Sequence, residues 1–305
     1  MKFIISIAIL ITVTLLPSLS RADEPFRVVT TLSSYADIVH SIGGERVEVT
    51  SVASPKFNPH FIEPRPSDVL KLKRADLFIH SGLDLEAWRD PLLDAAARSE
   101  LRYGGARQLD LSVGIPLLEV PEGQVSRAEG DIHQAGNPHY WIDPRNGLII
   151  AQRIATKLSE LDVAGKATYE NNLRVFEEKL QAKTKEWLTN AAPHHGKTVI
   201  GYHNEWPYLM QFLGVRMEEF IEPKPGIPPG PRHLEELVEY IKRTGTRAVV
   251  QTSFYPREAA DYLRKKTSVN TITLCQNVGE TPNCPDYISM IDFAVKELMR
   301  VLANG

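Results

Sequence analysis

The sequence contains little cysteine and no excess of basic charge. Its 305 residues include two cysteines, and 35 Lys and Arg residues stand against 38 Asp and Glu residues, for a net charge of −3. Proteins that bind nucleic acid usually carry a basic surface, because they must neutralise phosphates. The chain also lacks a glycine-rich phosphate loop, a Ser-His-Asp signature and an H-E-x-x-H motif. These absences argue against nucleic-acid, nucleotide and serine-hydrolase functions.

Long apolar runs are missing except at the N-terminus. Residues 3–16 are almost wholly apolar, Lys2 precedes them, and Pro17 and a short segment that ends at Ala22 follow. This order is typical of a secretory signal peptide, with a retained membrane anchor as the alternative. We therefore predict that residues 1–22 are cleaved and that the remaining chain is exported and soluble. No cysteine follows the apolar run, so lipid attachment there is not expected.

The two cysteines lie close together in the sequence, at Cys275 and Cys284. In an exported protein such a pair favours one disulfide that closes a short loop. Two free thiols, or Cys275 as a metal ligand, are the alternatives.

Short apolar runs alternate with helical patterns along the chain. We expect strands at residues 27–32, 47–53, 76–80, 198–202, 215–221, 248–252 and 271–274. We expect helices at residues 34–42, 66–74, 85–98, 147–161, 206–213, 233–243, 257–266 and 286–302. This alternation predicts an α/β fold in which helices cover parallel sheets. Removing 22 residues from 305 leaves 283, close to the limit of one core, so we predict two lobes.

A long helix is predicted between the two halves, at residues 165–192. Its apolar residues form one stripe with spacings of 4, 3, 4 and 7: Tyr169, Leu173, Phe176, Leu180 and Trp187. The stripe is too short for a convincing coiled-coil dimer. We therefore expect a monomer whose single backbone helix packs along both lobes, with domain limits at 23–163, 164–193 and 194–305.

Two segments show neither a helix nor a strand pattern. Residues 117–137 have no periodicity and are expected to form a loop. Residues 222–231 include five prolines, which predicts an extended and stiff connector. A peptide ligand for another protein is the alternative for this proline-rich segment.

Three of the nine histidines stand in distinctive contexts. Residues 58–61 (N-P-H-F) and 137–140 (N-P-H-Y) repeat one pattern, in which proline fixes its own φ and keeps the preceding residue extended. His60 and His139 are thereby held in defined poses, and His203 directly follows a predicted strand. All three loops should leave the carboxyl edge of a parallel sheet, where open α/β folds bind ligands. We expect the three side chains to meet in a cleft between the lobes.

Three neutral imidazoles in one cleft predict a metal site, with three unrelated loop histidines as the alternative. Imidazole nitrogen suits zinc, and manganese or iron are further candidates. Because three histidines and a water also form catalytic zinc sites, a zinc-dependent hydrolase with Glu63 or Glu205 as general base is a second hypothesis. Two other histidines are weaker candidates: His80 for lining the cleft, and His133 for passing metal inward.

Four longer segments carry recognisable motifs: residues 58–68 (NPHFIEPRPSD), 82–88 (GLDLEAW), 137–144 (NPHYWIDP) and 202–206 (YHNEW). They are similar, in that order, to the signatures P-H-x-x-E-P-x-P-S-D, G-L-x-L-E-x-W, P-H-x-W-x-D-P and F-H-D-x-F. The chain thus resembles, over most of its length, the periplasmic zinc- and manganese-binding proteins of metal ABC transporters (the ZnuA/TroA-like solute-binding family). The resemblance implies two (βα) lobes joined by one long helix.

The resemblance also implies a function and a ligand set. It implies that His60, His139 and His203 bind a divalent transition metal in the periplasm, and that the protein delivers the metal to a membrane permease. A metal-storage or adhesin-type protein without a transporter is the alternative. The region before the second ligand lacks the long histidine-rich loop of zinc-specific members, yet three nitrogen ligands favour zinc over manganese or iron.

The fourth ligand departs from the family pattern. The family uses an Asp in a D-S-L-G-like turn, and the matching turn here begins with Gln276. A neutral carbonyl oxygen is a poorer zinc ligand than a carboxylate. We therefore expect weaker binding, with Gln276, Glu205 or a water molecule in the fourth position.

Overall fold

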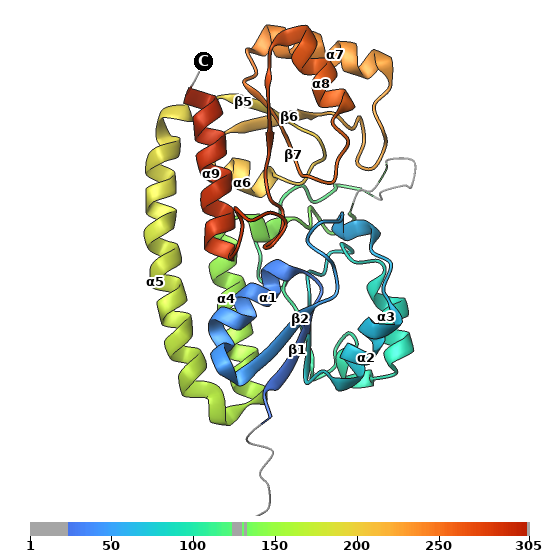
Figure 1. The fold of residues 1–305 in the computed structure, drawn as a ribbon, viewed down its shortest axis with the longest axis vertical. Coiled ribbons are helices and arrows are strands. Elements are labelled where there is room, and N and C mark those ends of the chain that lie inside the picture. The colour runs from blue at the N-terminus through green and yellow to red at the C-terminus, as the bar shows by residue number, and fades with distance from the viewer. Residues whose placement is uncertain (1–23, 124–129, 131–132, 304–305) are drawn as a thin grey trace, which may run out of the picture.

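The computed structural model describes residues 24–123, 130 and 133–303, and these form two lobes of matching topology (Figure 1). Each lobe holds four parallel strands, in the order β2-β1-β3-β4 and β6-β5-β7-β8. The second order is the first with every number raised by four, so the predicted α/β fold with two parallel sheets is confirmed. The predicted signal peptide, residues 1–22, lies outside the described residues. None of the helices within these ranges is long and apolar enough to cross a membrane.

The strands are short, and the two central strands of each sheet are the most buried, as expected for parallel strands covered on both faces. The first sheet contains β1 (Phe26–Thr30), β2 (Val47–Ser51), β3 (Leu77–His80) and β4 (Gln108–Asp110). The second sheet contains β5 (Thr198–Gly201), β6 (Arg216–Phe220), β7 (Ala248–Gln251) and β8 (Asn270–Thr273). In the first sheet β1 lies between β2 and β3, with Val28 opposite Val49 and Leu77.

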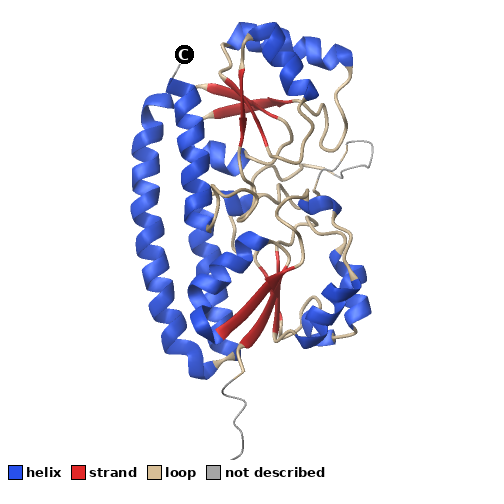
Figure 2. Cartoon of the chain, viewed as in Figure 1, coloured by secondary structure: helices blue, strands red, loops and turns tan. Residues whose placement is uncertain are grey.

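Helices flank both sheets, and long loops fill the space between the lobes (Figure 2). The first lobe contributes α1 (Ser33–Gly43), α2 (Pro66–Arg74), α3 (Arg89–Ala96) and α4 (Pro144–Leu161). The second lobe contributes α6 (Pro207–Leu213), α7 (Pro231–Thr244), α8 (Glu258–Thr267) and α9 (Tyr287–Ala303). Proline at the first position of α2, α4, α6 and α7 suits a helix start, because that residue's N–H needs no partner within the helix.

The long helix α5 (Lys166–Ala191) runs past both lobes, along one edge of the molecule (Figure 1). Its predicted stripe faces inward: Tyr169, Phe176, Leu180 and Trp187 are buried, and Leu173 is half-buried. The Trp187 indole N–H also donates to Asp292 of α9 at 3.0 Å. One continuous apolar core joins the first lobe to α5 and α9, so the predicted backbone helix is confirmed. The domain limits at 23–163, 164–193 and 194–305 stay a prediction.

Helix α3 begins four residues later than the sequence pattern predicts, at Arg89 instead of 85. The reason is a run of three residues with positive φ: Gly82 at 71°, Leu83 at 52° and Asp84 at 59°. Left-handed backbone is unfavourable at non-glycine residues such as Leu83 and Asp84, so it is rare there. Apolar spacing, which reports only which face of a helix is buried, cannot predict such a turn. β4 was also missed, because three residues give too short a pattern to detect.

The prediction that the proline-rich segment 222–231 is extended is wrong for part of the segment. The amide of Ile227 donates to the carbonyl of Lys224 at 2.9 Å, and Gly226 takes a φ of 77°. Glycine reaches this backbone region without strain, so the chain folds into a tight turn between two prolines. The described residues of 117–137 contain neither helix nor strand, as predicted.

The predicted disulfide between Cys275 and Cys284 is present. It closes the loop that follows β8 and precedes α9, and it excludes Cys275 as a metal ligand. Gln276 is therefore fixed on one side by a covalent link.

Candidate metal centre

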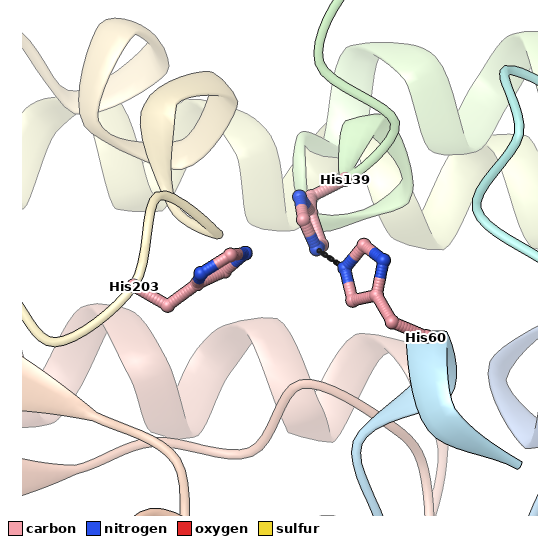
Figure 3. Close-up of side chains that lie close together, drawn as sticks. All are labelled: His60, His139 and His203. Atoms are coloured by element: carbon pink, nitrogen blue, oxygen red, sulfur yellow. Dashed lines mark hydrogen bonds between the residues drawn. The ribbon is translucent and has the colours of Figure 1, made fainter. Parts of the chain in front are cut away.

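Three histidine side chains meet between the two lobes (Figure 3). His60, His139 and His203 are all buried, and one ring nitrogen from each lies within 4.8 Å of the others. Nε2 of His60 lies 3.1 Å from Nε2 of His139. Two nitrogens that share a tetrahedral zinc ion lie about 3.3 Å apart, given zinc–nitrogen bonds of about 2 Å. His60 and His139 therefore have nearly the spacing that one metal ion requires, and a ring nitrogen of His203 lies within 4.8 Å of both.

The repeated Asn-Pro-His pattern forms the same local turn in both places. The side-chain oxygen of Asn58 accepts the backbone N–H of His60 at 3.0 Å. The side-chain oxygen of Asn137 accepts the backbone N–H of His139 at the same distance. Each turn leads into a short 3-10 helix, so the predicted locally fixed pose of both histidines is confirmed.

The His60 loop is held from the side by Trp88. Its indole N–H donates to the carbonyl of Pro59 at 2.8 Å, and the ring is largely buried. Trp88 ends the 82–88 motif, whose backbone turns sharply before α3. That motif therefore supports the His60 loop.

The hydrogen bonds of two histidines fix which nitrogen faces the cluster. Nδ1 of His139 lies 3.0 Å from the side-chain oxygen of Asn137, and Nδ1 of His203 lies 2.7 Å from Oε2 of Glu222. Because both partners are acceptors, each Nδ1 carries the hydrogen and donates it. The Nε2 lone pair is then left for a metal, as is usual when a second group orients a histidine ligand.

The surroundings keep two of these imidazoles neutral. Burial, with the neighbouring His203 and His133 rings, holds the pKa of His60 well below its ordinary value. Burial, with the nearby His60 and His203, does the same for the pKa of His139. Neutral imidazole is the form that binds a metal, so the pair needs no proton release at neutral pH before binding.

Gln276 is almost fully buried. Its Nε2 donates to Glu205 at 3.2 Å, and its backbone N–H donates to Glu280 at 2.9 Å. Its backbone carbonyl accepts the indole N–H of Trp141, whose ring packs against His139. Within the described part of the chain, Oε1 of Gln276 has no hydrogen-bond partner, so this buried oxygen is the atom available to a ligand.

Glu205, the other candidate for the fourth position, is fully buried two residues after His203. Burial and the charge of Glu280 raise the pKa of its carboxyl group well above the usual range. The carboxylate already accepts from Trp206 at 2.8 Å and from Gln276. These bonds orient it toward Gln276.

The two weaker histidine candidates have different outcomes. His80 does not join the cluster: Nδ1 accepts from Gly82 at 3.1 Å and lies 2.8 Å from the guanidinium of Arg89. Burial, followed by the charge of Arg89, lowers its pKa to about 3, so His80 is a neutral structural residue. His133, by contrast, stacks on His60 with 5.1 Å between ring centroids.

A cavity of about 290 Å³ adjoins the cluster. Its lining includes His133, His139, His203, Glu119 and Glu222. The sequence did not indicate Glu119 or Glu222, because both belong to aperiodic segments. The only local signal for Glu222 was its position just after a predicted strand, at the sheet edge that carries His203.

Comparison with known proteins identifies the family. The model of the family described as zinc-uptake complex component A, periplasmic (ZnuA), matches residues 28–301. The metal ABC transporter substrate-binding lipoprotein ScbA of Streptococcus cristatus is 32% identical over 296 residues, which cover 94% of this chain and 92% of ScbA. The manganese ABC transporter substrate-binding lipoprotein ScaA of Streptococcus gordonii is also 32% identical over 296 residues, with the same coverage of both chains.

A solved structure supports the fold. The crystal structure of ZnuA aligns with a TM-score of 0.77 and 22% identity, covering 91% of this chain and 99% of ZnuA. The chain therefore belongs to the ZnuA family of periplasmic substrate-binding proteins of metal transporters, as its motifs predict.

Proposed function

We propose that His60, His139 and His203 bind one divalent transition metal ion, with Oε1 of Gln276 as the fourth donor. The spacing of the three ring nitrogens is the observation that carries this proposal. The bound ion is the cargo, which the protein delivers from the periplasm to an ABC permease as a monomer.

Zinc is the metal that this donor set favours. Three imidazole nitrogens and one amide oxygen suit zinc, whereas manganese prefers carboxylate and water oxygens. The name of the Streptococcus gordonii relative assigns manganese to that protein. The glutamine at position 276 removes an anionic donor from the position where the family pattern has a carboxylate. We therefore expect zinc to bind more tightly than manganese, and iron to fall between them.

Isothermal titration of the metal-free protein with Zn²⁺ and Mn²⁺ tests the site. H139A removes one of the three nitrogens and should weaken zinc binding at least about a hundredfold, about 2.7 kcal/mol. The matched control is H195A, which removes an exposed histidine at the other end of β5 from His203 and should leave the affinity unchanged. Unchanged zinc affinity in H139A, or equal losses in both variants, would contradict the ligand assignment.

A second pair of variants tests the fourth donor. Q276D places a carboxylate at this position, so it should tighten binding and should favour manganese more than zinc. Q276A leaves the position to water and should weaken zinc binding. If neither variant changes either affinity, Gln276 is not a ligand.

The hydrolase hypothesis has less support from the geometry. Glu63 is exposed, and Glu205 is already held by Trp206 and Gln276. A general base must reach a water on the metal, and neither side chain is arranged for that step. Zinc-dependent turnover of model esters that is lost in H139A would favour the hydrolase instead.

A further inference from the structure

One carboxylate oxygen bridges the two ligand loops of opposite lobes. Oε2 of Glu119 accepts the side-chain N–H of Asn137 at 2.9 Å and the side-chain N–H of Asn204 at 2.6 Å. Asn137 lies two residues before His139, and Asn204 directly follows His203. A single atom thereby connects the loops that carry two of the three histidines.

The connection continues to the imidazole itself through Asn137. The amide group of Asn137 donates to Glu119 and to the carbonyl of Asn204, at 2.9 Å each. Its oxygen accepts both the backbone N–H and Nδ1–H of His139. Two donated and two accepted bonds use the full capacity of this amide. Glu119 therefore fixes the orientation of Asn137, and Asn137 fixes the orientation of His139.

The backbone of Glu119 is unfavourable for a residue with a side chain. Its φ is 55°, in the left-handed region that glycine occupies far more readily. The flanking backbone is anchored, since Tyr208 accepts the N–H of Leu118 and donates to the carbonyl of Asn137. Strain of this kind persists where the side chain has a role that the surrounding structure supports.

We propose that Glu119 is a positioning residue, a clasp that holds the His139 and His203 loops together and so slows release of the bound metal. This inference rests on the proposed function. Without the clasp, the two loops can move apart, and the ion loses ligands of one lobe before those of the other. The clasp therefore acts mainly on the dissociation rate.

The test compares four variants in the full chain loaded with zinc. Release is followed by stopped flow after mixing with an excess of chelator. E119A and E119G should both release zinc about five- to twentyfold faster than the wild type, because two charge-assisted hydrogen bonds are lost. E119Q should stay within about twofold, because its amide oxygen can accept both bonds. E122A removes a nearby charge from the same loop and should leave the rate unchanged.

E119G distinguishes an effect of the lost hydrogen bonds on zinc release from an effect on the stability of the fold. Glycine relieves the backbone strain, so E119G should be more stable to heat than E119A while it releases zinc as fast as E119A. A wild-type rate in E119G, or a rate in E119Q equal to that of E119A, would overturn the proposal in favour of loop shape or simple charge attraction.

Coupling gives an independent readout. N204A removes one of the two bonds to Glu119 and should also speed release. E119A/N204A should be no faster than E119A alone, because E119A already lacks the bond that N204A removes. Additive effects would overturn the clasp. If the wild type itself binds no zinc, the proposed function fails, whereas intact binding with unchanged release rates overturns only the clasp.

Discussion

Asp37 links the first lobe to the last helix, and its ionisation should destabilise the fold at neutral pH. It lies on α1 and accepts the backbone N–H of Tyr287 at 2.9 Å, at the start of α9. The pKa of Asp37 is raised to about 6, mainly by burial. The hydrogen bond from Tyr287 lowers it, the charge of Asp286 raises it, and His40 lowers it slightly. The carboxyl group is thus ionised at neutral pH in a place that disfavours the charge.

The size of the effect follows from the two pKa values. A rise from 3.8 to about 6 corresponds to about 3 kcal/mol, as an upper bound for a group that keeps some solvent contact. The native state holds this proton more tightly than the unfolded chain. The resulting stabilisation is therefore fully present below about pH 4 and is lost as the pH rises through about 6.

Asp37→Asn keeps an oxygen for the Tyr287 N–H and removes the ionisable group. We expect D37N to be about 1–3 kcal/mol more stable than the wild type at about pH 7.5, and equally stable at about pH 4. Urea denaturation of metal-free protein at several pH values measures both differences. The control E45Q removes an exposed charge next to the same helix and should show no such pH dependence. A gap between D37N and wild type that does not grow with pH would refute this reasoning.

Three further variants test the supports of the site and of the long helix. Trp88→Phe removes the indole N–H that holds the His60 loop. It should weaken zinc binding about three- to tenfold by titration with little change in the melting temperature, and unchanged affinity would show that this bond is dispensable. Replacing Cys275 and Cys284 by Ser opens a loop of about ten residues and should cost about 2.5 kcal/mol in urea denaturation. Leu180→Ala creates a cavity where α5 packs, so it should cost about 2–5 kcal/mol, and both lobes should unfold in one transition.

Much of the fold could be predicted because its elements rest on local patterns. The stripe from Tyr169 to Trp187 has helical spacing, and it is the buried face of α5. The start of α3 could not be predicted in the same way. The carboxylate of Glu86 accepts the backbone N–H of Ser81 across the left-handed turn. Helix α3 begins only after this turn, at Arg89. Apolar spacing carries no information about such a contact.

In the candidate site, too, residues placed by local sequence could be predicted and residues placed by tertiary packing could not. His60 and His139 could be predicted because each follows an Asn-Pro pair that fixes its turn within four residues. Glu119 and Glu222 could not, since each reaches its partner only after distant segments have packed. His80 shows the reverse error: it ends a strand at the expected sheet edge, but its hydrogen bonds direct it away from the cluster.

The central claim is that three imidazole rings from two lobes coordinate one ion. X-ray absorption spectroscopy at the zinc edge of the zinc-loaded protein measures this most directly. We predict one zinc per chain, with three imidazole nitrogens at about 2.0–2.1 Å and a single oxygen donor. A shell of oxygen donors with fewer than three imidazoles, or a spectrum unchanged in H139A, would contradict the account.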